Sequence, residues 1–372
     1  MILRRSLFAA LLVLLVGSDI ALARAPTIDG LSRDRAIAVD AAVEAEMKNQ
    51  HVVGVAVGIV ENGKVVYSKG YGLADREKKI PVTTDTMFRW ASCSKMLTAV
   101  ATMQLVQKNA LNIDADVRKL VAEFPDKGVT ITTRELLDHQ SGIVHYDNGK
   151  VIRTERSYAM PHPFADVILA LDTFKESPLV NPPGEKYSYS THGFILLSAV
   201  AQRACKQTFA DQVHDRIVQP LGLVTLRPDY QWLNIPNRAV GYRTHDEKIE
   251  RSSDTDVSWK LGGGGFISNI DDFANFAAGL INHRLVSSKI ENEMWTQQTL
   301  KDGELTERGL GFVVQTDKAG KLKISHDGEQ EKTRTRLVIY PHEKHGVVVM
   351  TNSEWVDPGK FSTAVYAALG TH

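Results

Sequence analysis

Ser92-Cys93-Ser94-Lys95 stands directly before the apolar run MLTAVATMQLV at residues 96–106. A run that is apolar nearly all round predicts a buried helix rather than a surface helix. Ser92 is then expected in the first turn, where serine suits the end of a helix. Lys95 follows three residues later, so both side chains are expected on one face of this helix.

The spacing of Ser92 and Lys95 has a chemical use. A serine hydroxyl becomes an effective nucleophile when a neighbouring base takes its proton. Burial disfavours the ammonium form of lysine, so a buried Lys95 can be that base. The start of the helix adds unpaired backbone N–H groups, which favour developing negative charge. Because S-x-x-K is a short pattern, the alternative is a buried helix with a capping serine and a lysine whose charged end reaches solvent.

The composition restricts the class of partner. The chain has 372 residues, enough for one large domain or two modest ones, and its formal net charge is zero. No basic excess points to nucleic acid or to an anionic membrane. We therefore expect a small-molecule or peptide substrate, and the sequence leaves an oligomer open.

The first residues have the pattern of an export signal. Arg4 and Arg5 precede an apolar stretch at residues 7–16 and the small-residue site ALA at 21–23. We predict a signal peptide over residues 1–23 and a periplasmic or secreted protein. The apolar stretch is short for a membrane span, so an uncleaved anchor is the lesser alternative and no stable span is expected. Cys93 and Cys205 are expected to be free, buried thiols, with a disulfide as the alternative.

Both ends of the chain predict parts of one sheet and its covering helices. Apolar residues at i, i+4 and i+8 from Val39 predict a first helix, and β-rich runs at residues 51–60 and 64–70 flank the hairpin signal Asn62-Gly63. Near the other end, strands are predicted at 311–316, 321–326, 334–340 and 346–351, before a last helix around residues 361–369. Short turns between neighbouring strands indicate an antiparallel sheet, with the two terminal helices on one face.

The middle of the chain has a different pattern. Helical runs at residues 133–138, 164–171 and 194–205 alternate with proline-containing loops, and little strand is predicted. The fold class is therefore α/β: an antiparallel sheet flanked by N- and C-terminal helices, with a mainly helical inserted subdomain. We place the sheet part at residues 24–86 and 260–372 and the helical part at 87–259. The Ser92 helix lies at their junction, where pockets tend to occur.

Two further motifs carry candidate site residues. In Tyr189-Ser190-Thr191, a phenol can shuttle protons if a nearby cation stabilises its anion; the alternative is a loop tyrosine beside a helix that begins near Gly193. His326-Asp327-Gly328 ends a predicted strand, where glycine lets a substrate backbone approach and the histidine could donate a hydrogen bond to it. The alternative is a surface histidine before a turn.

Other patterns are excluded by their spacing. The glycine run at residues 262–265 has no following Lys-Ser or Lys-Thr pair, so we expect it to let a strand or turn pass close to the active cleft rather than bind phosphate. The sequence HEKH at 342–345 lacks the spacing of a helical zinc motif. We therefore expect no metal and no cofactor.

The order S-x-x-K, Y-S-T and H-x-G resembles the serine β-lactamase-like family, which includes class C β-lactamases, penicillin-binding proteins, D-amino-acid peptidases and esterases. The resemblance covers roughly residues 53–369 and implies a β-lactamase/transpeptidase-like fold. It implies that Ser92 is acylated, that Lys95 activates it and that Tyr189 relays the proton. The backbone N–H of Ser92 and one near Gly328 would form the oxyanion hole.

Two departures from the family pattern affect the expected substrate. Thr191 stands where many relatives have asparagine, and His326 stands where many have lysine. The acids Asp327 and Glu329 flank the histidine motif, and they should repel a substrate carboxylate unless Lys332 or Arg334 compensates. We therefore expect a secreted serine hydrolase that cleaves an amide or ester, with peptidase or esterase activity favoured over β-lactamase activity. The alternative is a penicillin-binding or self-assembling, non-catalytic module on the same fold.

Overall fold

The computed structural model describes residues 30–246 and 248–370. The predicted signal peptide, residues 1–23, lies outside the described residues. Within those described ranges, no helix is both long enough and apolar enough to cross a membrane.

The main sheet of the described chain has seven antiparallel strands in the order β3-β2-β1-β12-β11-β10-β9. The strands are β1 (Gly54–Glu61), β2 (Lys64–Asp75), β3 (Ile80–Pro81), β9 (Val313–Thr316), β10 (Leu322–Gln330), β11 (Thr333–Tyr340) and β12 (His345–Thr351). The predicted hairpin turn between β1 and β2 is confirmed, because Asn62 and Gly63 both have positive φ, at 51° and 71°. The four C-terminal strands also lie where the sequence predicted them, although β10 continues four residues further.

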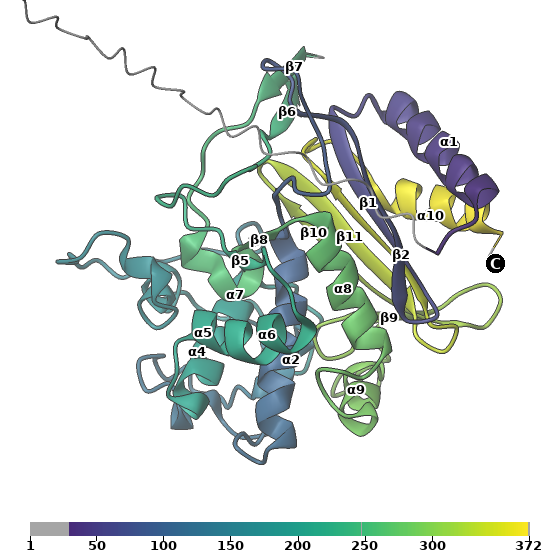
Figure 1. The fold of residues 1–372 in the computed structure, drawn as a ribbon. Helices are drawn as coiled ribbons and strands as arrows, with labels where there is room; N and C mark the ends of the chain where they lie inside the picture. The colour runs from purple at the N-terminus through teal and green to yellow at the C-terminus, as the bar shows by residue number, and fades with distance from the viewer. Residues whose placement is uncertain (1–29, 247, 371–372) are drawn as a thin grey trace, which may run out of the picture.

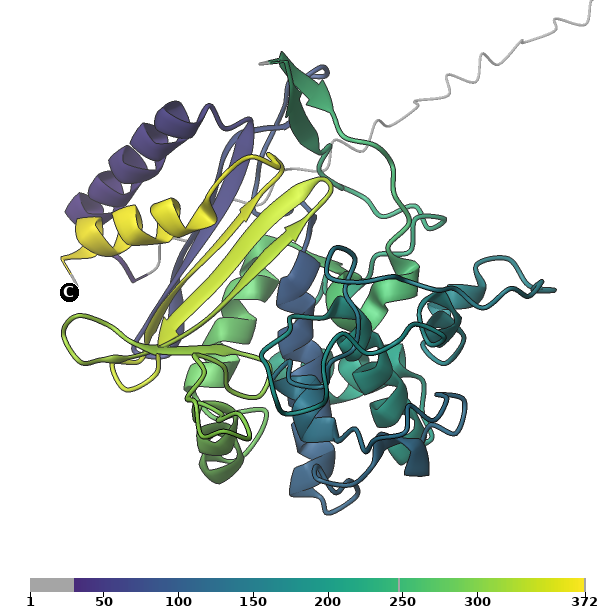
Figure 2. The same cartoon turned by 180° about the vertical axis from the view of Figure 1, so that it is seen from behind.

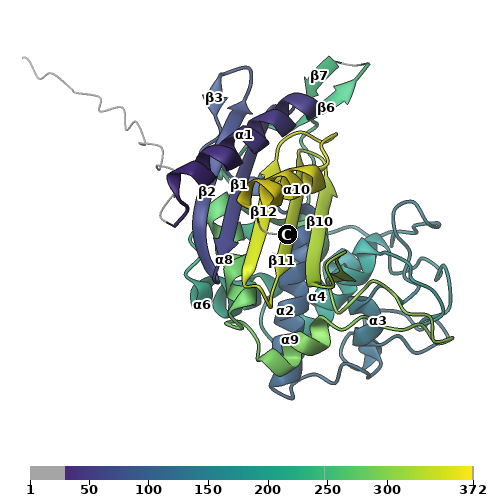
Figure 3. The ribbon, with the colours of Figure 1, turned by 90° about the vertical axis from the view of Figure 1, so that its right-hand side faces the viewer.

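Helices cover both faces of this sheet. The terminal helices α1 (Arg33–Gln50) and α10 (Pro358–Leu369) lie side by side on one face, as Figures 1 and 3 show. Alternate residues of β1, including Val55 and Val57, are fully buried beneath them. The residues between, such as Ala56, belong to the core on the other face, where α8 (Ile270–Ile281) packs. Successive side chains of a strand point to opposite faces, so the consecutive apolar residues of β1 contribute to both cores. The predicted fold class is confirmed.

The rest of the described chain forms a mainly helical region beside the sheet. Its helices are α2 (Ser94–Gln107), α3 (Thr133–Leu137), α4 (Thr191–Cys205), α5 (Phe209–Val213), α6 (Gln219–Leu221), α7 (Leu261–Gly264) and α9 (Ser288–Met294). Two small sheets add β4 (Phe88–Arg89), β8 (Phe266–Ser268) and β5 (Arg227–Pro228), and β6 (Tyr242–His245) with β7 (Lys248–Arg251).

The prediction of a helix at residues 164–171 is wrong. This stretch contains two short 3₁₀ turns, Pro163–Ala165 and Leu169–Thr173, separated by Asp166 in an extended conformation. The Asp166 carboxylate accepts a hydrogen bond from the backbone N–H of Ile168 at 2.9 Å. Such a local bond from an aspartate side chain competes with the helical pattern, and the apolar spacing alone does not reveal it.

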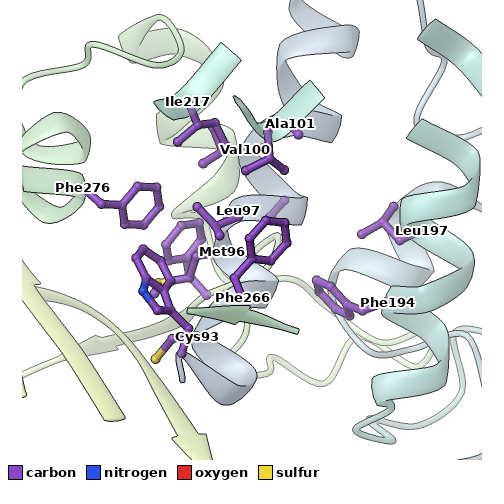
Figure 4. Packing of buried hydrophobic residues seen from close by; sticks show 14 of the residues in the cluster. Cys93, Met96, Leu97, Val100, Ala101, Phe194, Leu197, Ile217, Phe266 and Phe276 are labelled. Atoms are coloured by element: carbon purple, nitrogen blue, oxygen red, sulfur yellow. The ribbon is translucent and has the colours of Figure 1, made fainter. Parts of the chain in front are cut away.

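Helix α2 is the buried element between the sheet and the helical region (Figure 2). Figure 4 shows Met96, Leu97 and Val100 of this helix among aromatic side chains from other elements, including Phe194 and Phe266. The prediction of a buried helix is confirmed. Both cysteines are free, but only Cys93 is fully buried, so the expectation of two buried thiols was wrong for the half-buried Cys205.

The segment that leads into α2 is held by β11. The hydroxyl of Thr333 donates to the Arg89 carbonyl at 3.1 Å, and the hydroxyl of Thr335 donates to the Trp90 carbonyl at 2.8 Å. The Arg89 guanidinium forms a buried ion pair with Asp229 at 2.6 Å. These contacts fix the chain immediately before Ser92, so that the position of this serine depends on the sheet as well as on its own helix.

Candidate active site

Ser92 lies in a short 3₁₀ turn, Ala91–Cys93, just before α2 rather than in its first turn. The N-cap of α2 is Cys93, so Ser92 precedes the helix instead of lying in its first turn, and the alternative of a capping serine is excluded as well. Strand β10 approaches this turn closely at Gly328. A Cβ atom on Gly328 would lie 2.4 Å from the Trp90 carbonyl oxygen, so only glycine fits beside the turn.

Lys95 is fully buried beneath the Ser92 hydroxyl. Its Nζ lies 3.1 Å from Ser92 Oγ, 3.1 Å from Thr191 Oγ1 and 2.7 Å from the carbonyl oxygen of Gly263. Among the residues that the structure describes, no carboxylate lies within 4.0 Å of it. Burial, and next the charge of Lys260, hold the pKa of Lys95 well below its usual range. A neutral amine that donates to the other two oxygens keeps its lone pair for the proton of Ser92.

Tyr189 reaches the same point from the segment before α4. Its hydroxyl is hydrogen-bonded to Ser92, and the centre of its ring lies 4.9 Å from Lys95 Nζ. Burial raises the pKa of Tyr189 above its usual value, and the hydrogen bond with Ser92 opposes this only in part. The phenol is therefore protonated at rest, which suits the proton relay expected of Tyr189 from the sequence.

Two histidines fix the Y-S-T segment. Nδ1 of His139 accepts a hydrogen bond from the Ser190 backbone N–H at 3.1 Å, and Nδ1 of His145 accepts one from the Thr191 N–H at 3.2 Å. Helix α4 begins at Thr191, two residues earlier than predicted, and Ser190 is its N-cap. Burial lowers the pKa of His145 to about 4, so its ring remains the neutral acceptor that this contact requires.

His326 is a buried, neutral imidazole. Its Nδ1–H donates to the carbonyl oxygen of Asp327 at 2.7 Å, because a carbonyl can only accept. Burial lowers the pKa of His326 to about 3, so its Nε2 carries no proton near neutral pH. The donor role suggested from the sequence is therefore not the one that this geometry offers. His326 presents a hydrogen-bond acceptor.

The acids beside His326 are already paired. Asp327 accepts two hydrogen bonds from Arg336 Nη1, at 2.5 and 2.8 Å, and Glu329 accepts one from Arg334 at 2.7 Å. Lys332, which the sequence offered as a compensating cation, is paired with Asp254 instead. The expected repulsion of a substrate carboxylate is thus largely offset. Arg334 compensates Glu329, as the sequence allowed, whereas Arg336 was missed because its place opposite Asp327 depends on the register of β10 and β11.

A pocket of about 650 Å³ brings most of the predicted site residues together. Ser92, Tyr189, Thr191 and His326 line it, while Lys95 lies beneath Ser92 and Gly328 lies behind the nucleophile turn. Sequence reasoning gave no role to several other lining residues: His145, Tyr146, Lys260, Arg308 and Arg336. His145, Tyr146 and Lys260 occur in stretches that resemble the family, whereas a single cation such as Arg308 has no spacing that could have revealed it.

No metal centre is evident in the described part of the chain. There, no group of three or more histidine, cysteine, aspartate or glutamate side chains is arranged to hold an ion. The chemistry that the described residues themselves offer is a serine hydroxyl beside a neutral amine and a protonated phenol. This set suits acyl transfer to serine.

The sequence of the chain matches that of known proteins. The sequence model described as "Beta-lactamase" matches residues 39–370. The human protein "Serine beta-lactamase-like protein LACTB, mitochondrial" is 29% identical to the chain, over 85% of the chain and 76% of that relative.

Two solved structures show the same fold. "EstCE1, a hydrolase with promiscuous acyltransferase activity" superposes with a TM-score of 0.76 at 20% identity, covering 90% of this chain and 98% of that one. The D-amino acid amidase from Ochrobactrum anthropi SV3, complexed with L-phenylalanine amide, superposes with a TM-score of 0.75 at 20% identity, covering 91% and 99%. At these identities the likeness is evidence of fold alone.

Proposed function

The chain belongs to the beta-lactamase family, and from this we propose that it is a serine hydrolase that cleaves an ester or amide bond through a covalent acyl-enzyme on Ser92. One observation carries the proposal. The amine of Lys95, fully buried and with a lowered pKa, lies 3.1 Å from the Ser92 hydroxyl at a pocket. A lysine that merely reached toward solvent would not have its charged end buried without an acid.

The proposed reaction uses these three side chains in sequence. Lys95 takes the proton of Ser92 as Oγ attacks the substrate carbonyl, and the N–H groups of Ser92 and of β10 near Gly328 stabilise the oxyanion. The phenol of Tyr189 donates its proton to the leaving group and regains one from Lys95 through the hydrogen-bonded cluster. Water then attacks the acyl-enzyme, gives its proton to the same cluster and releases the acid and Ser92.

The edge of β10 supports an extended substrate. Pairing with β9 ends at Ser325, whereas pairing with β11 continues to Gln330. Residues of that last part, including His326 and Glu329, line the pocket. An extended backbone can add to such an edge by main-chain hydrogen bonds, with the neutral Nε2 of His326 accepting an N–H. This supports amides or peptides as substrates beside simple esters.

Covalent labelling tests the proposal directly. We expect a fluorophosphonate probe to add one label per folded chain, with the adduct on the peptide that contains Ser92. Ser92→Ala should remove the label, and Ser141→Ala should keep it. An unlabelled protein with normal circular dichroism would contradict the proposal and favour the non-catalytic module. If the probe labels Ser92, assays of unlabelled enzyme with short esters, D-amino-acid amides and nitrocefin would separate esterase, peptidase and β-lactamase activity.

The proposed base predicts the pH profile. Protonated Lys95 cannot accept the Ser92 proton, so kcat/KM for a neutral ester should rise with pH through the lowered pKa of Lys95. The pKa of His145 is about 4 and that of His326 about 3, so neither should produce this limb near neutral pH. Lys260→Gln removes a charge that lowers the pKa of Lys95, and should move the limb to higher pH. A limb that stays in place would show that Lys95 is not the group that titrates.

A further inference from the structure

Lys260 is a buried cation that has no acidic partner among the residues that the structure describes. It ends the short turn Ser258–Lys260, lines the active-site pocket and is only 9% exposed. Within the described ranges, its Nζ forms no hydrogen bond and no acid lies within 4.0 Å. Two aromatic rings hold it, with their centres 5.6 Å (Trp259) and 5.8 Å (Tyr146) from Nζ. A buried ammonium without an anion is unfavourable, and the rings offset only part of that cost.

The acids of the pocket do not neutralise this charge. Asp327 and Glu329 are paired with arginines of β11, and Glu307 accepts a hydrogen bond from Gln315 at 2.6 Å. Asp147 also lines the pocket, but it is not within ion-pair distance of Lys260. Burial lowers the pKa of Lys260, and Glu331, which acts through space without contact, opposes that shift and favours the charged form. The positive charge is therefore available to a molecule that enters the pocket.

The position of Lys260 places it near the reaction. Its ammonium faces the ring of Tyr146, the Tyr146 hydroxyl is hydrogen-bonded to Thr191, and Thr191 accepts a hydrogen bond from Lys95. Only two side chains separate it from the proposed base. Tyr146 is itself 47% exposed, so this wall of the pocket is open to a ligand. One small substrate could therefore place a charged group beside Lys260 and its scissile bond at Ser92.

We propose that Lys260 binds a carboxylate of the substrate, so that the enzyme acts on acidic esters or amides in preference to neutral ones. The inference rests on the proposed serine hydrolase function. A carboxylate would complete an ion pair between aromatic walls, where the local dielectric constant is low and the attraction is strong. The acids of β10 do not prevent this, because they are already paired.

Matched esters test the inference. Mono-p-nitrophenyl glutarate and p-nitrophenyl pentanoate differ in that a carboxylate replaces the terminal methyl group of the acyl chain. We expect a higher kcat/KM for the glutarate ester in the wild-type enzyme, and Lys260→Gln should reduce the glutarate-to-pentanoate ratio about 10- to 100-fold, mainly through KM. A second pair, 3-carboxyphenyl and phenyl pentanoate, places the carboxylate on the leaving group. Loss of preference in either pair supports the inference and shows which side Lys260 contacts.

Two variants control for general electrostatics. Lys260→Arg keeps a cation and should retain most of the preference. Arg308→Gln removes another cation of the same pocket, one that is hydrogen-bonded to Tyr187, and should leave the ratio within about 3-fold. Because each result is a ratio of two substrates, the effect of Lys260 on the pKa of Lys95 cancels.

The outcomes separate the inference from the proposed function. If the neutral esters are hydrolysed but Lys260→Gln leaves both ratios unchanged, the carboxylate site is wrong and the hydrolase remains. If no ester is hydrolysed and no probe labels Ser92, the hydrolase is wrong. Calorimetric titration of the folded protein with glutarate then tests the carboxylate site without any hydrolysis. Binding that is lost in Lys260→Gln supports the site, whereas no binding, or equal binding by the wild type and the variant, overturns it.

Discussion

Ser92→Ala is expected to lower kcat/KM for p-nitrophenyl butyrate by about 10⁴- to 10⁶-fold, as loss of the nucleophile does in other serine hydrolases. The physical reason is that Ser92 offers a primary hydroxyl at the pocket, 3.1 Å from the buried Lys95 amine. Thr191 lies at the same distance, but its hydroxyl is secondary and is also hydrogen-bonded to Tyr146. The measurement is initial-rate kinetics on purified protein, with a thermal melt to show that the variant is folded.

Ser141→Ala is the matched control for this experiment. Ser141 is also buried near the site, but its hydroxyl accepts only a long hydrogen bond from Ile143, at 3.4 Å, and it has no lysine beside it. Its loss should change kcat/KM by less than about 3-fold. If a folded Ser92→Ala variant retains ester hydrolysis and Ser141→Ala is inactive, the nucleophile is not Ser92.

Lys95→Met is expected to lower kcat/KM by roughly 10³- to 10⁴-fold. Methionine fills a similar volume but cannot accept the Ser92 proton, and the tyrosine beside it has a raised pKa and stays protonated. The rate of fluorophosphonate labelling should fall with the rate of hydrolysis, because both require the activated hydroxyl. Both rates are measured over the pH range in which the wild-type enzyme is fully active.

Two further lysine variants show whether the effect belongs to the base. Lys95→Arg should not restore activity, since a guanidinium stays protonated at any accessible pH. Lys127→Met removes another lysine with a pKa lowered by burial, one that donates to backbone carbonyls away from the pocket, and should leave kinetics unchanged. Activity retained by Lys95→Met would mean that a different group deprotonates Ser92.

Local sequence signals predicted most of the sheet correctly. Asn62-Gly63 favours a tight turn with positive φ at both residues, and the β-rich runs on either side of it form the neighbouring strands β1 and β2. The terminal helices followed from apolar residues one turn apart. The stretch around Asp166 was predicted less well, because a hydrogen bond between side chain and backbone overrode its helical spacing.

The candidate site was predicted as a set of motifs rather than as a geometry. The order of S-x-x-K, Y-S-T and H-x-G identified residues that the structure places around one pocket. Their protonation states did not follow from the motifs. Burial holds the pKa of Lys95 well below its usual range, lowers that of His326 to about 3 and raises that of Tyr189, and burial is a property of everything packed around a residue.

The sequence by itself determined the antiparallel sheet, its terminal helices and the spacing of Ser92 and Lys95, because these depend on residues that are neighbours along the chain. The tertiary structure alone decided which charges cancel. Arg336 neutralises Asp327 from the adjacent strand, whereas Lys260 is enclosed by aromatic rings without an acid. Ion pairing depends on distances of a few ångströms between side chains far apart in sequence, and only the packed chain sets those distances.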